Sequence, residues 1–246
     1  MGNFNKLAAV AQIKWICITK NTAIMLGPVL TIGMVVCFKI LYGINSGGEL
    51  SPMLISLLLN MGISINICCD GFMMVGTAIA EEKEKHTLRV LMTSSVSGMQ
   101  YFIGSIVFPF ILTIITNFII LEISGLSMQQ VSIPAFLAVS AIASLISCVI
   151  GMIVGICAKN QMNASMIASP LIMVFMLIPM LGGLSDGLHK LSGFLFTGIV
   201  AEMAAGFANG TGYAITPMDI AVLSGELIIS VLIFLMLYKG NGYERD

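Results

Sequence analysis

The chain has 246 residues, of which 58% are hydrophobic and 9% are charged, and its net charge is −1. A soluble domain carries about a quarter charged residues, so 11 basic and 12 acidic side chains are too few to keep a globule of this size dissolved. The composition therefore predicts an all-α polytopic membrane protein with a single transmembrane domain over residues 1–246. It excludes a soluble α/β enzyme, and the absence of a basic stripe excludes nucleic acid as a partner.

The N-terminal residues 1–20 precede the first long apolar run. Within them, apolar side chains recur at helical spacing, while Lys6 and Lys14 fall elsewhere on the helical wheel. This pattern predicts an interfacial helix on the inner leaflet of the lipid bilayer, with Trp15 at the level of the headgroups. The apolar positions are Phe4, Leu7, Ala8, Ala11, Trp15 and Ile18.

Six later runs are long and apolar enough to cross a bilayer, which needs about 20 residues per helix. The predicted spans are residues 22–43, 52–79, 101–123, 134–157, 164–182 and 218–238.

The distribution of Lys and Arg sets the predicted orientation. With six spans and both termini in the cytosol, nine of the eleven basic residues lie inside and only Lys39 and Lys190 lie outside. Basic residues accumulate on the cytoplasmic side of membrane proteins. We therefore expect a multi-pass protein of the cytoplasmic (plasma) membrane with both termini cytosolic.

The outer segment 183–216 is long for a loop. Its apolar stretch Leu191–Ala205 has only 15 residues and contains Glu202, which favours a re-entrant or interfacial segment before the last span. The alternative is a seventh span, which would place Lys239 and Arg245 outside the cell.

Catalytic and metal-binding motifs are missing from the sequence. There is no Walker A motif, the cysteines form no CxxC pair, and the two histidines, His86 and His189, fall on opposite sides of the predicted membrane. The sequence therefore predicts no catalytic residue, no metal site and no cofactor in this chain.

Four polar residues inside the spans are candidates for a transport pathway: Asn60, Asn66, Asp70 and Glu226. Polar groups within a bilayer are costly and often functional. Asn66 and Asp70 are four residues apart and share a helix face, which indicates either a pathway lining or a hydrogen-bonded helix seam. A third reading places Asp70 near the inner interface, because the run 52–80 is longer than a span needs.

The segment between the second and third spans combines charge with an apolar turn. Six of the nine residues from Glu81 to Arg89 are charged, and Leu88, Leu91 and Met92 share one helix face. Serines then supply capping oxygens for the next helix.

This segment resembles the intracellular loop of permease subunits of ABC-2-type exporters. The matching residues are Glu82 or Glu84, Thr87, Leu88, Leu91, Ser94, Val96, Ser97 and Gly104. The sequence departs from the family pattern at Arg89, Ser95 and Ser105. The resemblance implies that residues 81–99 form a coupling loop, whose ATPase-coupling residues are Glu82, Glu84, Thr87, Leu88, Arg89, Leu91, Met92 and Ser94.

The resemblance also implies partners. Two permeases pair, alike or not, and two separate ATPase subunits, which hold ATP and Mg²⁺, dock on the coupling loops. We expect this chain to move an amphipathic peptide, antimicrobial or toxin-like, or a hydrophobic drug out of the cell. The alternatives are an ion- or proton-coupled secondary carrier and a non-transporting immunity or sensor subunit of the membrane.

Overall fold

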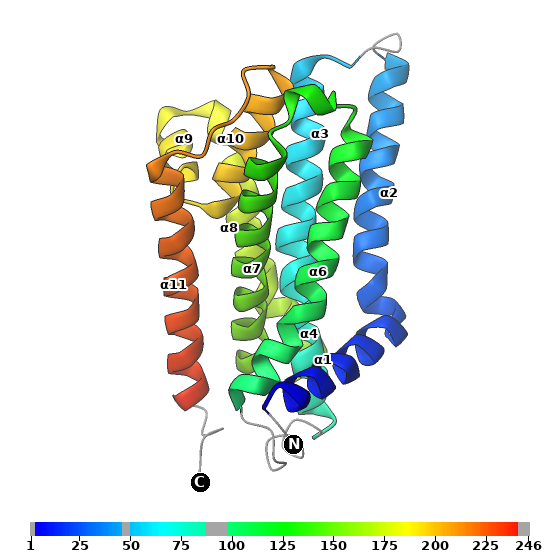
Figure 1. Ribbon diagram of the computed structural model, residues 1–246, viewed down its shortest axis with the longest axis vertical. Helices are drawn as coiled ribbons and strands as arrows, with labels where there is room; N and C mark the ends of the chain where they lie inside the picture. The colour runs from blue at the N-terminus through cyan, green and yellow to red at the C-terminus, as the bar shows by residue number, and fades with distance from the viewer. Residues whose placement is uncertain (1–2, 46–49, 87–97, 241–246) are drawn as a thin grey trace.

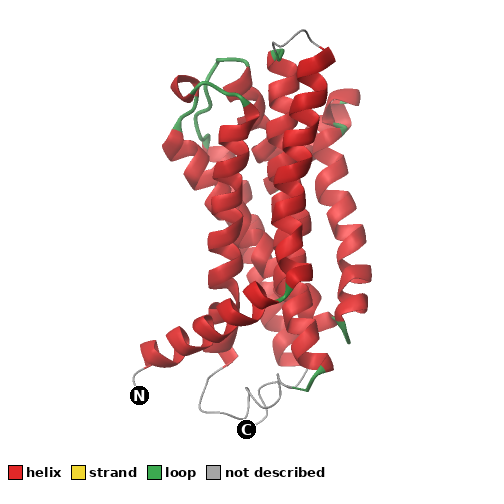
Figure 2. Ribbon diagram, turned by 90° about the vertical axis from the view of Figure 1, so that its right-hand side faces the viewer, coloured by secondary structure: helices red, strands yellow, loops and turns green. Residues whose placement is uncertain are grey.

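The computed structural model describes residues 3–45, 50–86 and 98–240, and the regular structure in these ranges is helical throughout (Figure 2). Six helical segments are long and apolar enough to cross a membrane. The predicted fold class, an all-α polytopic membrane protein, is confirmed.

The six candidate spans lie side by side along the length of the molecule (Figure 1). They are α2 (Thr22–Asn45), the continuous segment α3 (Pro52–Ile65), η1 (Asn66–Gly71) and α4 (Phe72–Glu84), α6 (Gly98–Ser124), α7 (Ile133–Cys157), α8 (Gln161–Met180) and α11 (Pro217–Gly240).

Shorter elements mark the two ends of this bundle. Helix α1 crosses one end, here called the α1 end, and α9 and α10 lie at the opposite end, the α9 end (Figure 1). The short elements are α1 (Asn3–Lys20), η2 (Met128–Gln130), η3 (Gly182–Leu184), α9 (Asp186–Ser192) and α10 (Phe196–Ala208).

Each span differs in extent from the sequence prediction by at least one residue, and two of these differences have a visible cause. The second span continues to Glu84 instead of ending near residue 79, because its charged last turn finds partners on neighbouring helices, described below. Helix α8 begins at Gln161 instead of residue 164, because Asn160 caps it: the Asn160 side chain accepts the backbone N–H of Asn163 at 2.8 Å.

Helix α1 packs on the bundle with a face that includes a lysine. The stripe that packs on the bundle is Val10, Lys14 and Ile18, each at most 4% exposed. Lys14 lies off the predicted apolar face, and it is buried because it finds partners on α4 and α6. Trp15 is 52% exposed, and its ring packs edge-on against Phe108 of α6.

Helix α7 is the most buried span, and it packs closely on α4. A Cβ added at Gly151 of α7 would lie 2.8 Å from the carbonyl oxygen of Phe72, and one at Gly155 would lie 2.7 Å from Cβ of Ile79. Glycines at these positions let the two backbones approach each other, and van der Waals packing of this kind holds helices together in lipid. In contrast, α2, α8 and α11 are largely exposed.

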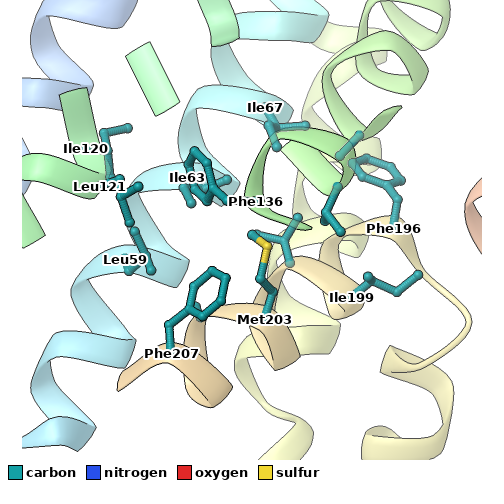
Figure 3. Packing of buried hydrophobic residues seen from close by; sticks show 14 of the residues in the cluster. Leu59, Ile63, Ile67, Ile120, Leu121, Phe136, Phe196, Ile199, Met203 and Phe207 are labelled. Carbon is teal, nitrogen blue, oxygen red and sulfur yellow. The ribbon is translucent and has the colours of Figure 1, made fainter. Parts of the chain in front are cut away.

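The predicted outer segment folds as two helices, α9 and α10, which meet at an angle of 105°. Figure 3 shows Met203 and Phe207 of α10 near Leu59 and Ile63 of α3, and Ile199 belongs to the same buried cluster. All five side chains are fully buried. The apolar stretch is thus part of the core of the bundle.

Candidate functional site

The last turn of α4 is fastened to its surroundings by four consecutive residues, Glu81, Glu82, Lys83 and Glu84, which we call the α4 anchor. At its centre, the Lys14 ammonium donates to Oε1 of Glu82 at 2.5 Å and to the Tyr101 hydroxyl at 2.9 Å. Tyr101 in turn donates to Oε2 of Glu82. This triad joins α1, α4 and α6.

The triad is largely shielded from solvent. Lys14 is 2% exposed and Tyr101 is 1% exposed, and the Lys14 ammonium also lies 4.2 Å from the centre of the Tyr101 ring. Burial lowers the pKa of Lys14, and the carboxylate of Glu82 opposes that shift. A buried ion pair of this kind becomes strongly destabilising when one partner is removed, so the triad ties the three helices firmly together.

The other residues of the α4 anchor reach further elements. Glu81 accepts from Asn21, the residue between α1 and α2, at 3.1 Å. Lys83 donates to the carbonyl oxygens of Ile156 and Ala158 at 2.6 and 2.5 Å. It thereby pairs carbonyl groups that the end of α7 leaves without helical partners.

Glu84 completes the anchor by accepting the backbone N–H of Gln161, the first residue of α8, at 3.3 Å. A carboxylate near a helix N-terminus is favourable because it complements the partial positive charge there. The α4 anchor therefore contacts α1, α6, α7 and α8, each through a different side-chain interaction.

Of the predicted coupling residues, Glu82 and Glu84 belong to the α4 anchor. The remaining six lie outside the residues that the structure describes: Thr87, Leu88, Arg89, Leu91, Met92 and Ser94. Since α4 ends at Glu84 and α6 begins at Gly98, the connection between them starts and finishes at the α1 end of the bundle.

The predicted polar face of the second span falls in the π-helical turn η1. Asn66 donates to the Thr113 carbonyl at 2.8 Å and to Oδ1 of Asn117 at 2.7 Å, both on α6. Ser147 of α7 donates to the Ile67 carbonyl within the turn. Single π turns inside α-helices are frequent at functional sites, and here Ser147 of a neighbouring helix supplies a donor to one carbonyl of the turn.

Asp70 lies four residues after Asn66 but contacts a different helix. Its Oδ2 accepts from the Thr31 hydroxyl of α2 at 2.8 Å. Its Oδ1 lies against Gly27, where an added Cβ would be only 2.5 Å away. Asp70 also lines a cavity of about 610 Å³ between α2, α4 and α8, which we call the Asp70 cavity.

The structure does not bring the other three pathway candidates, Asn60, Asn66 and Glu226, into this cavity. Asn60 is half-buried, and its Oδ1 accepts from Ser64 one turn later on the same helix. Glu226 of α11 accepts the backbone N–H of Phe196 at 2.7 Å. It therefore supplies an acceptor for the first N–H of α10, as a helix N-cap would.

Sequence reasoning missed the partners that give these residues their setting, chiefly Lys14, Tyr101, Thr31 and Gly27. The run Glu81–Lys85 did indicate a charged helix end, but each partner is distant in sequence, so nothing in the local pattern identified it. Lys83 was counted only as a cytosolic positive charge.

Comparison with known protein families covers the part of the chain that holds the α4 anchor and the Asp70 cavity. A family model described as ABC-2 type transporter matches residues 5–179, which include the α4 anchor, the Asp70 cavity and nearly all of α1 and α8. No curated protein matches the chain. The family match covers more than two thirds of the sequence and confirms the resemblance seen between Glu82 and Gly104. The chain belongs to the ABC-2 type transporter family, as a membrane-embedded permease.

Proposed function

We propose that this chain is the permease subunit of an ATP-driven exporter, paired with a second permease and served by two separate ATPase subunits. ATP and Mg²⁺ bind to those partners, and this chain supplies the pathway. The cargo is an amphipathic peptide or a hydrophobic drug. The exposed apolar surfaces of α2, α8 and α11 are available to lipid and to the second permease.

The α4 anchor is the observation that carries this proposal. A force applied to the segment between α4 and α6 reaches these two helices directly. It then passes through Glu82 to α1, through Lys83 to the end of α7, and through Glu84 to the start of α8. An ATPase that pulls on this segment would therefore move the bundle as a connected unit.

The distribution of charge supports an α1 end that faces the cytosol, where the ATPases reside. Lysines gather in cytoplasmic segments, and only Lys39 and Lys190 among the described lysines lie toward the α9 end. Those at the α1 end are Lys6, Lys14, Lys20, Lys83, Lys85, Lys159 and Lys239.

We infer that the coupling residues have two different roles. Glu82 is engaged by Lys14 and Tyr101, so we assign it to anchoring α4. The apolar positions Leu88, Leu91 and Met92 then form the docking surface for the ATPase, since apolar side chains among charges mark interaction sites. Glu84, which is exposed, and Arg89 form its polar rim.

The test is to disrupt the docking surface without touching the anchor. We expect Leu88→Asp and Leu91→Asp to insert normally but to lose a co-purifying polypeptide that is labelled by azido-ATP, or to lose cargo-stimulated ATP hydrolysis. Leu184→Asp is the matched control, because Leu184 is 76% exposed at the α9 end. Wild-type co-purification and hydrolysis in both loop variants would refute the proposal.

A further inference from the structure

We infer that the Asp70 cavity binds a lipophilic monocation, that is, an apolar molecule that carries one positive charge. The inference rests on the proposed function for the role of this molecule as cargo. Binding itself depends only on the permease and can be tested without an ATPase.

Asp70 lies deep in the bundle. It is twelve residues from Glu82 along one continuous helical segment, which corresponds to about 18 Å at the rise of a helix. Glu82 meets the interfacial helix α1, so this separation places Asp70 well inside the membrane-crossing part of the bundle. Charged groups at such depth are rare and pair with one another or mark a substrate path.

Among the described residues, the Asp70 carboxylate has no cationic partner, although charges within a membrane are usually paired. Within the described residues, the Thr31 hydroxyl is its one hydrogen-bond donor, and no Lys, Arg or His forms an ion pair with it. None of the described residues donates a hydrogen bond to Oδ1 of Asp70. Asp70 is 6% exposed, and that small opening faces the cavity. A cation in the cavity would supply the missing charge in surroundings of low dielectric constant, where electrostatic attraction is strong.

The rest of the cavity wall suits an apolar body. Three methionines, Met73, Met74 and Met162, contribute to it together with Ile24 and Cys69. Methionine side chains are flexible and polarisable, so they adapt to ligands of different shape. The volume of about 610 Å³ lies in the range of sites for drug-sized molecules and far exceeds what a bare metal ion would fill.

A second cavity, of about 420 Å³, indicates the route of access. Gln161 and Met162 line both this cavity and the Asp70 cavity, and Glu84 and Lys85 also line the second one. Lys85 pairs with Glu81 at 2.5 Å, which offsets its charge. The two cavities therefore adjoin at the start of α8, on the side of Asp70 that faces the α1 end.

Tetraphenylphosphonium and tetraphenylborate are the probes that test this inference, because they have nearly the same size and shape but opposite charge. Binding of each is measured on the purified permease in lipid nanodiscs, and empty nanodiscs give the correction for partition into lipid. We expect saturable binding of tetraphenylphosphonium and none of tetraphenylborate. Equal binding of both ions would overturn the inference.

Variants assign the binding to this cavity. Asp70→Asn should weaken tetraphenylphosphonium binding by at least about tenfold, the scale of a lost charge pair in a desolvated site. Glu122→Gln, which alters an exposed carboxylate on α6, should bind as wild type does. Unchanged binding in Asp70→Asn would overturn the inference.

A second pair of variants leaves Asp70 intact. It tests whether tetraphenylphosphonium binds in the Asp70 cavity even if Asp70→Asn does not assemble. Ser165→Phe fills the cavity from α8, whereas Ser169→Phe lies one turn farther along, on an exposed position outside the cavity wall. We expect only Ser165→Phe to lose tetraphenylphosphonium binding, and equal binding in both would refute a site here. The binding measurements use the permease without an ATPase. A failure of the co-purification test would therefore count against the proposed function and leave this inference unaffected.

Discussion

Glu82 and Asp70 are acidic residues of the same membrane span, and their surroundings differ sharply. Glu82 is held by an ammonium and a phenol from two other helices, whereas Asp70 has a single threonine hydroxyl and a cavity beside it. Fully paired charges fix a structure, and a carboxylate without an ionic partner is available to a ligand. The comparison thus separates a residue that holds the bundle from one that can receive a ligand.

The largest expected effect is the removal of Lys14 from the triad. Lys14→Met should lower the free energy of unfolding in detergent by about 3 kcal/mol, because Glu82 keeps its burial but loses its ionic partner. Thermal unfolding of the purified permease measures this.

The double variant Lys14→Met/Glu82→Leu is the control. It should be more stable than Lys14→Met alone, because it leaves no unpaired charge. A double variant that is as unstable as the sum of the two single variants would show that the ion pair does not couple α1 to α4.

A smaller effect is expected where Asp70 meets α2. Gly27→Ala would place a methyl group 2.5 Å from Oδ1 of Asp70 and should cost about 2 kcal/mol through overpacking. Gly33→Ala on the same helix has open space around it and should be neutral or stabilising by about 0.5 kcal/mol. Equal stability of the two variants would mean that α2 and Asp70 are not in contact.

The smallest expected effect on stability comes from neutralising Asp70, and it compares Asp70 directly with Glu82. Asp70→Asn should leave the free energy of unfolding within about 1 kcal/mol of wild type, because no ion pair is lost and asparagine can still accept from Thr31. Glu82→Gln should cost about 1.5 kcal/mol more, because it weakens charge-assisted bonds to Lys14 and Tyr101. Parallel melting curves of the two variants test this, and a larger loss for Asp70→Asn would assign Asp70 to holding the structure.

Much of the architecture was predictable from the sequence. Apolar runs of about 20 residues specify membrane spans, and six helices of this length and composition lie in the part of the chain that the structure describes. The charged run after residue 80 and the motif up to Gly104 identified the family. These signals are local, since hydropathy and short motifs are read from neighbouring residues.

The candidate site was predictable only in part. Asn66 and Asp70 stood out because polar groups are costly in a membrane, but their partners lie 39 to 51 residues away in sequence. The π turn between them also departs from the α-helical spacing on which the shared face was predicted.

The sequence by itself determined that this chain is a helical membrane protein, where its spans lie and which family it belongs to, because lipid demands long apolar helices whatever their neighbours are. The tertiary structure alone decided that Lys14 is buried against Glu82, that Glu226 accepts the first N–H of α10, and that Asp70 faces a cavity. Whether a charged side chain has an ionic partner or faces a cavity depends on which distant helix packs beside it. Side-chain packing and close backbone contacts across the whole bundle determine which helix that is.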